Sequence, residues 1–273
     1  MKNEIESHPD LFGKLCLDYY LTGNEPEKTF YELCSQKKDA NRNKVSDMTV
    51  QIPDYPISFY VDSKLRQIEQ DILSTYAVGT ILDIGCGCSR VHTFLEQQQK
   101  KPQSRQKVKV IGIDNSPSML HISQAKGATV YPRNILTQSI NDLPADTYLL
   151  MGNGWGMPGK PEQLKKVLRK IHHASPPHAS VIGESNDPTK STIEADQICN
   201  RLNIHDGLYI GSRKWRFGAS INGDINNGKP SNWTLYEPDF LQKVAQECGW
   251  RLKEQVAEKG SPYAAYFVIL QKG

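Results

Sequence analysis

The sequence predicts an α/β protein of three layers, in which helices cover both faces of a mostly parallel, seven-stranded sheet. From residue 61 onward, short apolar segments alternate with segments of helical length, which is the pattern of parallel strands joined by helices. The last two apolar segments, 250–256 and 261–271, are separated by only a short turn. They must therefore pair antiparallel, so the sheet is predicted to close with a C-terminal hairpin.

The elements of this main domain are expected in the following order. Strands are predicted at 80–85, 108–114, 128–132, 146–153 and 179–185, before the two strands of the hairpin. Helices are predicted at 62–76, 91–101, 116–127, 160–174 and 237–249. The region 185–235 interrupts the alternation, and its segments 207–220 and 232–237 are predicted as antiparallel strands of a β-rich insertion. The main domain is therefore expected to span 61–273.

Residues 1–60 carry too few apolar side chains to bury a core of their own. A helix is predicted at 10–21, and a second one at 24–34 with Asn24 as its N-cap and Pro26 in its first turn. The polar stretch 35–47 is predicted as a linker. We therefore expect a helical cover that docks on the main domain.

Composition and charge exclude several classes of protein. The chain has 273 residues and a net charge of +3, and its lysine runs are interrupted by other residues, so a nucleic-acid partner is not expected. No apolar run approaches the about 18 residues of a membrane span. The N-terminus lacks the apolar core of a signal peptide. The six cysteines are scattered, which indicates free thiols in the cytoplasm.

The stretch Asp83–Arg90, "DIGCGCSR", joins the first predicted strand to a helix. This places its glycines at the carboxyl edge of the sheet, where ligands bind in open α/β folds. Gly85 and Gly87 allow the backbone to approach a ligand closely. Asp114 ends the next strand, where an acid can accept both hydroxyls of a ribose. The dinucleotide fingerprint G-x-G-x-x-G fails, because Arg90 stands at its third glycine.

The motifs "LDIGCGCSR" and "IGIDNSPSML" resemble motifs I and II of the class I S-adenosylmethionine-dependent methyltransferases, in a bacterial branch that acts on small molecules. The family pattern D-x-G-x-G-x-G is matched except that Ser89 replaces the third glycine. The closing hairpin also fits that family. The resemblance covers 62–184 and 236–271, and it implies a Rossmann-like methyltransferase fold with strand order 3-2-1-4-5-7-6.

The resemblance implies the binding site for S-adenosylmethionine. Asp83 would face the methionine part, Asp114 would hold the ribose, and Asn134 would replace the acid that reads the adenine amino group. Asn153 would lie beside the reactive end of the cofactor. The implied cofactor residues are Asp83, Gly85, Cys86, Gly87, Asp114, Asn115, Met119, Asn134, Ile135, Asn153, Gly154 and, from the cover, Tyr20.

No catalytic base is evident from the sequence. The candidates follow from their position at or after the fifth strand, and they are Glu184, His205, Asp206 and Tyr209. The pair Cys86 and Cys88 supplies only half of a tetrahedral metal site, and the chain has no second such pair. We therefore expect no metal, and we interpret both cysteines as small residues in a tight turn.

The resemblance implies transfer of a methyl group to an oxygen or nitrogen atom of a small metabolite, leaving S-adenosyl-L-homocysteine. A covered site favours a small acceptor, because a nucleic acid or protein needs an open cleft. An RNA or protein methyltransferase remains an alternative, as does a non-catalytic module that binds S-adenosylmethionine. The identity of the acceptor and the oligomeric state stay open, with a homodimer as one alternative.

Overall fold

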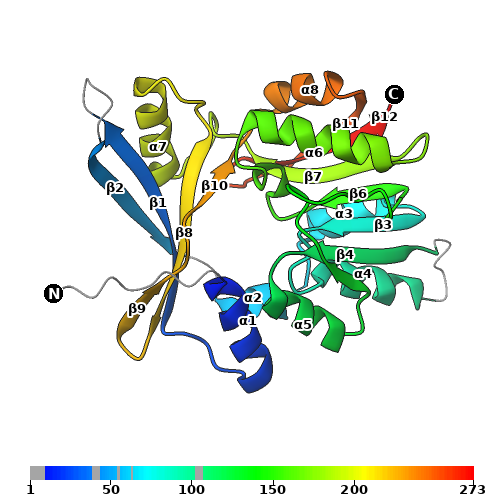
Figure 1. The fold of residues 1–273 in the computed structure, drawn as a ribbon, viewed down its shortest axis with the longest axis horizontal. Coiled ribbons are helices and arrows are strands. Elements are labelled where there is room, and N and C mark those ends of the chain that lie inside the picture. Colours follow the sequence, from blue (N-terminus) through cyan, green and yellow to red (C-terminus); the bar gives the residue numbers. More distant parts are fainter. Residues whose placement is uncertain (1–9, 39–43, 54–55, 63, 102–106) are drawn as a thin grey trace.

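The computed structural model describes residues 10–38, 44–53, 56–62, 64–101 and 107–273, with only the backbone for 31–38 and 44–53. Seven strands form the main sheet (Figure 1). They are β3 (Thr80–Ile84), β4 (Lys109–Asp114), β5 (Val130–Pro132), β6 (Thr147–Leu150), β7 (Ser180–Asn186), β11 (Trp250–Ala257) and β12 (Ala265–Lys272). Their order across the sheet is β11-β12-β7-β6-β3-β4-β5. Strands β3 to β7 run parallel, and β12 is antiparallel to both β7 and β11. The predicted strand order and closing hairpin are confirmed.

Helices cover both faces of this sheet, as expected for three layers. Helices α3 (Gln67–Tyr76) and α4 (Arg90–Gln99) pack on the face that carries Ile81 and Leu149. Helices α6 (Pro161–Ala174) and α8 (Pro238–Gln246) pack on the opposite face, which carries Leu82 and Tyr148. Because successive strand residues point to opposite faces, the apolar runs of β3 and β6 supply both cores.

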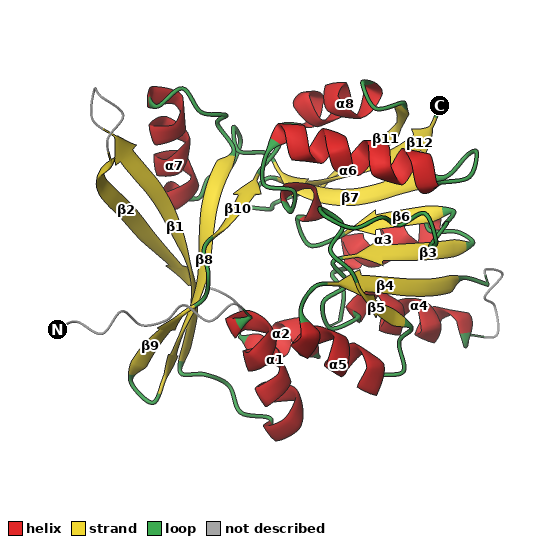
Figure 2. Cartoon of the chain, viewed as in Figure 1, coloured by secondary structure: helices red, strands yellow, loops and turns green. Residues whose placement is uncertain are grey.

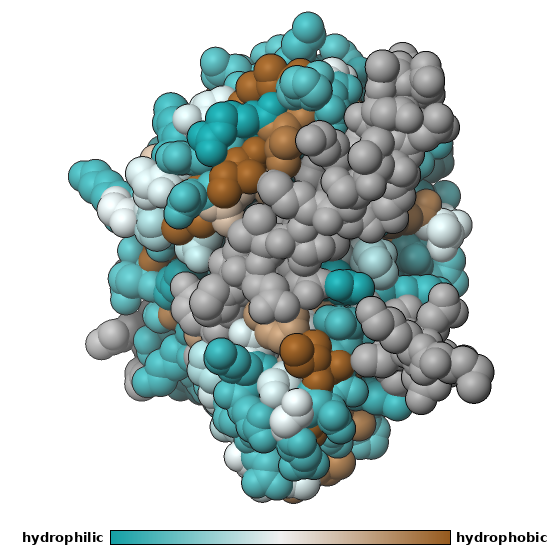
Figure 3. Space-filling view, turned by 90° about the vertical axis from the view of Figure 1, so that its left-hand side faces the viewer, coloured by the Kyte–Doolittle hydropathy of each residue, from teal (hydrophilic) through white to brown (hydrophobic). Residues whose placement is uncertain are grey.

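A second, antiparallel sheet combines the N-terminal segment with the insertion. Its strands are β1 (Lys28–Lys38), β2 (Lys44–Pro53), β8 (Ser212–Ile221), β9 (Asp224–Asn227) and β10 (Ser231–Thr234). Their order is β10-β8-β1-β2, and β9 pairs with the far end of β8. Figure 2 shows this sheet standing opposite the carboxyl ends of the parallel strands. Figure 3 views the molecule from the side of this sheet, where described hydrophilic and hydrophobic side chains are mixed.

The prediction of a helix at 24–34 is wrong, because Lys28–Lys38 forms strand β1 between β2 and β8. The predicted linker is also wrong in part, since 35–38 belongs to β1 and 44–47 to β2, while 39–43 lies outside the described residues. Thr29, Phe30 and Tyr31 favour a strand once β8 is available for pairing. That partner lies far away in the sequence, so the local pattern could not reveal it.

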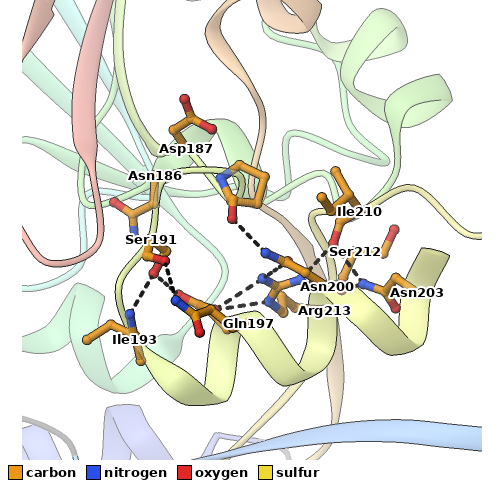
Figure 4. A network of polar contacts seen from close by, with 12 residues as sticks. Asn186, Asp187, Ser191, Ile193, Gln197, Asn200, Asn203, Ile210, Ser212 and Arg213 are labelled. Carbon is orange, nitrogen blue, oxygen red and sulfur yellow. Dashed lines mark hydrogen bonds and ion pairs between the residues drawn. The ribbon is translucent and has the colours of Figure 1, made fainter. Parts of the chain in front are cut away.

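The insertion contains a helix that the sequence analysis missed, α7 (Glu194–His205), in addition to the predicted strands. A buried polar network joins it to β8 (Figure 4). Arg213 lies 3.1 Å from the carboxylate of Asp196 and donates to Asn200 at 2.8 Å. The amide of Asn200 donates in turn to the carbonyl of Pro188 at 2.6 Å. The network therefore ties the second sheet to the loop that leaves β7.

Two short helices fill the space between the second sheet and α5 (Pro117–Ala125). They are α1 (Leu11–Thr22) and α2 (Ile57–Val61). Leu15 of α1 packs with Ile122 of α5 and Ala219 of β8 in one apolar cluster. The helix predicted at 10–21 is confirmed. The division of the chain into a cover, a main domain and an insertion stays a prediction. Within the described residues, no helix combines the length and apolar character needed to cross a membrane.

Candidate functional site

The glycine-containing loop after β3 turns beneath the end of β4. The backbone N–H groups of Gly85 and Cys86 donate to the carbonyl of Ile113 at 2.8 and 3.1 Å. Gly85 has φ +75° and Gly87 has φ +52°, in the left-handed region that favours glycine. A Cβ atom at either position would have no neighbour closer than 3.5 Å, so the backbone is open on that side. The loop therefore offers a bare backbone surface at the carboxyl edge of the sheet.

Ser89 stands at the position of the third glycine of the family motif, and its backbone conformation is that of a glycine. It has φ 58° and ψ 38°, the left-handed conformation, and it directly precedes helix α4. Its side chain is buried, and its hydroxyl has no hydrogen-bond partner among the described residues. The chain thus retains the backbone shape that a glycine would supply at this position, with a non-glycine residue in it.

Asp114 is attached to the same loop by its carboxylate. One oxygen accepts from the backbone N–H of Gly87 at 3.0 Å, and the other accepts from Ser116 at 2.8 Å. Burial raises the pKa of Asp114, while these backbone hydrogen bonds oppose the rise. The acid that ends β4 is therefore bonded to the backbone of the glycine loop, while its predicted contact with a ribose stays a prediction.

Asp83 lies at the end of β3 and is almost completely buried. Burial, together with the nearby Asp114, raises the pKa of Asp83 to about 7. Among the described residues no Lys, Arg or His forms an ion pair with it. A buried carboxyl group without a cation is costly to ionise. It therefore suits a ligand that brings a positive charge.

Cys86 turns its side chain away from the loop surface. A Cβ atom on Gly112 would lie 2.7 Å from the Cys86 sulfur, so the thiol packs directly over β4. Leu120 and Val130 complete this cluster, and burial raises the pKa of the thiol. Within the described part of the chain, no group of three or more His, Cys, Asp or Glu side chains could hold a metal ion.

The residues expected near the adenine of the cofactor differ in burial and in the contacts of their side chains. Met119 is buried with its sulfur near Gly87, and Asn115 is exposed beside it. The side-chain oxygen of Asn134 accepts from the backbone of Leu136 at 2.9 Å, which forms a local turn. The side chain of Ile135 belongs to the core beneath, so only its backbone is available at this edge.

Tyr20 packs against the apolar cluster that contains Cys88 of the glycine loop. Its ring centroid is 5.9 Å from the ammonium group of Lys126, which directly follows α5 and donates to the carbonyl of Cys88 at 3.4 Å. The N-terminus of α5 is flanked by Ser116, whose hydroxyl contacts Asp10 at 2.9 Å. The N-terminal segment therefore reaches the edge of the sheet through Asp10 and approaches the glycine loop from the side of Tyr20.

The loop after β6 contributes the next part of the edge. Gly152 and Asn153 both have left-handed backbones, with φ 61° and 60°. The backbone N–H of Asn153 donates to Glu184 of β7 at 3.3 Å. The side-chain oxygen of Asn153 is buried and finds no hydrogen-bond partner among the described residues. Gly154, the last predicted residue here, begins the short 3-10 helix η1 (Gly154–Gly156) and is buried.

Glu184 is the one candidate base that the structure brings to this edge. Its carboxylate lies 2.6 Å from Arg66, which also contacts Glu69 and Glu258. Burial raises the pKa of Glu184, and the opposing effect of Arg66 is smaller. The sequence analysis did not identify Arg66 as a site residue. The available signal was Glu69, because a Glu three residues after an N-cap marks the start of a helix, and the N-cap here is Arg66.

The other three candidate bases do not reach the loops of the glycine motif or of β6. His205 is largely exposed at the end of α7 and pairs with its neighbour Asp206 at 2.9 Å. The hydroxyl of Tyr209 donates to the carboxylate of Glu237 at 3.3 Å, and its ring packs on Phe240. These contacts give all three residues structural roles that need no substrate.

Aromatic side chains of the second sheet pack on three neighbouring elements. Phe217 of β8 packs on Phe12 of α1, with ring centroids 4.8 Å apart. Trp233 of β10 approaches Gly156 so closely that a Cβ there would lie 2.0 Å from the indole nitrogen. Trp215 packs against Cys199 of α7, and its ring centroid lies 6.4 Å from that of Trp233. These contacts fasten the second sheet to α1, η1 and α7.

No family model and no curated protein matches the sequence. Solved structures do match it. An S-adenosylmethionine-dependent methyltransferase from Bacteroides fragilis, in complex with S-adenosyl-L-homocysteine, has a TM-score of 0.68 and 19% identity, with 97% of this chain and 95% of that chain covered. The CcbJ methyltransferase from Streptomyces caelestis has a TM-score of 0.57 and 14% identity, with 77% and 91% covered. The chain has the fold of S-adenosylmethionine-dependent methyltransferases.

A methyltransferase from Methanosarcina mazei adds a third match, with a TM-score of 0.57, 15% identity and coverage of 77% of this chain and 99% of that one. The Bacteroides match extends over nearly all of this chain, so it includes the second sheet. The methyltransferase fold explains why the glycine loop, Asp114 and the loop after β6 meet at one edge. The predicted fold class is confirmed, whereas the predicted roles of individual residues stay predictions.

Proposed function

We propose that the protein is an S-adenosylmethionine-dependent methyltransferase that acts on an oxygen or nitrogen atom of a small molecule. The observation that carries this proposal is the left-handed loop Gly85–Ser89 with Asp83 buried beneath it and Asp114 bonded to it. When bound, S-adenosylmethionine supplies a methyl group on a positively charged sulfur.

The residues of the edge fit that cofactor. Asp83 is a buried carboxyl group without a cationic partner, and it would hold the ammonium group of the methionine part. Asp114 has oxygens already oriented by the backbone of Gly87 and Ser116, and it would accept the hydroxyls of the ribose. The open backbone at Gly85 and Gly87 leaves room for the cofactor to approach.

Glu184 is proposed as the group that takes the proton of the acceptor. An acceptor hydroxyl or ammonium must lose a proton to become a nucleophile, and a carboxylate with a raised pKa is a stronger base for that proton. Glu184 has such a raised pKa, and it is bonded to the backbone of Asn153 in the loop after β6. Arg66 would keep its carboxylate oriented between turnovers.

The second sheet supports a small acceptor. Its aromatic side chains pack on three neighbours, with Phe217 on α1, Trp233 on η1 beside the loop after β6, and Trp215 on α7. Apolar aromatic walls with a few polar groups are typical of small-molecule sites. A cytoplasmic location agrees with five free, buried cysteines among the described residues.

The cofactor is tested first, by calorimetric titration of S-adenosyl-L-homocysteine into the purified protein and two glycine variants. Gly85→Val should abolish binding, because Val is strained at φ +75° and fills the open side of the loop. Gly127→Val is the matched control, since Gly127 has φ +84°, open space around it and a position at the far end of α5. Equal binding by the wild type and Gly85→Val, with both folded, would contradict the proposal.

Turnover is tested second, by incubating the protein with labelled S-adenosylmethionine and a pool of small metabolites. Glu184→Gln should retain the cofactor and lose most of the turnover. Glu258→Gln is the matched control. Glu258 pairs with the same Arg66, whereas Glu184 also accepts a hydrogen bond from the backbone of Asn153. Labelling of RNA or protein would overturn the small-acceptor proposal. Binding without turnover on any pool would indicate a non-catalytic module.

A further inference from the structure

Helix α1 approaches the N-terminus of α5 closely at a glycine. A Cβ atom on Gly13, in the first turn of α1, would lie 2.3 Å from the hydroxyl oxygen of Ser116 and 2.4 Å from a carboxylate oxygen of Asp10. Glycine inside a helix makes the helix itself less stable than alanine would. The bare backbone at Gly13 therefore serves the close approach of Asp10 and Ser116, and not the helix.

Asp10 uses its carboxylate outside its own helix. It stands at the N-cap of α1, where an acid usually accepts from the first turn, but its side chain makes no capping bond. One oxygen accepts instead from the hydroxyl of Ser116 at 2.9 Å. The same hydroxyl accepts from the backbone N–H of Met119 at 3.2 Å, as the N-cap of α5. The hydroxyl of Ser116 is thus engaged both as donor and as acceptor, which holds its side chain in one orientation.

Ser116 also connects α1 to the acid that ends β4. Its backbone N–H donates to one oxygen of Asp114 at 2.8 Å, and the other oxygen accepts from Gly87 at 3.0 Å. Burial raises the pKa of Asp114, and the negative charge of Asp10 adds to that rise. Ser116 gives each carboxylate one donor, which offsets the repulsion between them. One chain of hydrogen bonds therefore runs from Asp10 to the glycine loop.

We propose that Asp10 is a positioning residue for the cofactor, because it holds Ser116 and thereby fixes the carboxylate of Asp114 toward the ribose. This inference rests on the proposed function, in which Asp114 accepts the ribose hydroxyls of S-adenosylmethionine. A carboxylate that is oriented before the ligand arrives loses less freedom on binding. Docking of α1 and binding of the ribose are then coupled, so each stabilises the other.

The test compares S-adenosyl-L-homocysteine with its analogue that lacks the 2′-hydroxyl, by calorimetric titration into the full-length protein. The wild type should bind the analogue roughly tenfold to a hundredfold more weakly, because a hydrogen bond to a carboxylate is lost. In Asp10→Ala this ratio should shrink by about twofold to tenfold, which is the coupling expected between neighbouring groups. A residue that only supports the fold would weaken both ligands equally and leave the ratio unchanged.

Three further variants separate the hydrogen bond from the charge and from the fold. Asp10→Asn keeps an oxygen that can accept from Ser116, so it should retain the wild-type ratio. Gly13→Ala should shrink the ratio as Asp10→Ala does, because its Cβ would displace Asp10 or Ser116. Asp18→Asn is the matched control, since Asp18 is an exposed acid on the same helix, and it should leave the ratio unchanged.

The coupling has a second readout, which is hydrogen exchange of the backbone amides of α1. S-adenosyl-L-homocysteine should slow this exchange in the wild type, and it should slow it less in Asp10→Ala. Equal protection of α1 in both proteins would overturn the coupling.

The role of Asp10 and the proposed function fail in different ways. A wild-type ratio in both Asp10→Ala and Gly13→Ala would overturn the role of Asp10 and leave the cofactor in place. A ratio in Asp10→Asn as small as that in Asp10→Ala would also overturn it, because the charge and not the hydrogen bond would then matter. A folded wild type that binds neither ligand would contradict the proposed function, and this inference with it.

Discussion

The replacement of Ser89 by glycine tests whether the loop is determined by backbone shape. Ser89 has a left-handed backbone at φ 58°. This conformation costs a residue with a Cβ atom about 1–2 kcal/mol relative to glycine. Part of this gain, about 0.5–1 kcal/mol, is lost because glycine makes the unfolded chain more flexible and so favours unfolding. Ser89→Gly should therefore raise the free energy of unfolding by about 0–1.5 kcal/mol, the difference between these two terms.

The assay is urea unfolding followed by circular dichroism. The midpoint should rise while the slope with urea stays unchanged. In thermal unfolding, 1 kcal/mol corresponds to about 2–4 °C in a protein of this size class. Affinity for S-adenosyl-L-homocysteine should stay near wild type, because the loop keeps its shape.

Ser89→Ala serves as the control, since it removes the hydroxyl and keeps the left-handed strain. Its midpoint should not fall below that of the wild type, because the buried hydroxyl has no hydrogen-bond partner to lose among the described residues. A lower midpoint for Ser89→Gly, or a loss of ligand affinity, would refute the reasoning. It would mean that the hydroxyl, and not the backbone, determines the loop.

Three other predictions use charged groups. The pKa of Asp83 is raised to about 7, so the folded chain keeps a proton that the unfolded chain releases above its ordinary pKa of 3.8. The urea midpoint should therefore rise as pH falls from about 8 to about 5, and Asp83→Asn should flatten that rise more than the exposed control Asp142→Asn. Asp114→Ala should weaken S-adenosyl-L-homocysteine binding by about 1.5–3 kcal/mol for each hydrogen bond lost to its carboxylate, and calorimetry showing unchanged affinity would exclude a ribose contact. Arg213→Met should cost about 3–5 kcal/mol of stability, because Asp196 is left buried and unpaired. The double variant with Asp196→Leu should recover part of this loss in a double-mutant cycle.

The main sheet could be predicted because its signals are local. Each parallel strand is buried on both faces, so it reads as an apolar run whatever its neighbours are. The closing hairpin follows from the length of one turn. The motif around Asp83 and the acid at Asp114 are likewise read from single segments.

The second sheet could be predicted only in part. Strands β8 and β10 were expected, but β1 was mistaken for a helix, because the pairing of Phe30 with Gly218 joins residues that are far apart in sequence. The same limit applies to the site. Arg66 and Glu184 meet across two elements, and Cys16 of α1 shares an apolar cluster with Cys88 of the glycine loop.

By itself, therefore, the sequence determined the layers of the main domain, the order of its strands through a family resemblance, and the edge where a ligand would bind. The tertiary structure decided which of the candidate bases reaches that edge and which elements pack beside it. The physical reason is that burial periodicity and turn chemistry are properties of one segment. Strand pairing, buried ion pairs and thiol contacts depend on the meeting of two segments, which only the folded chain brings about.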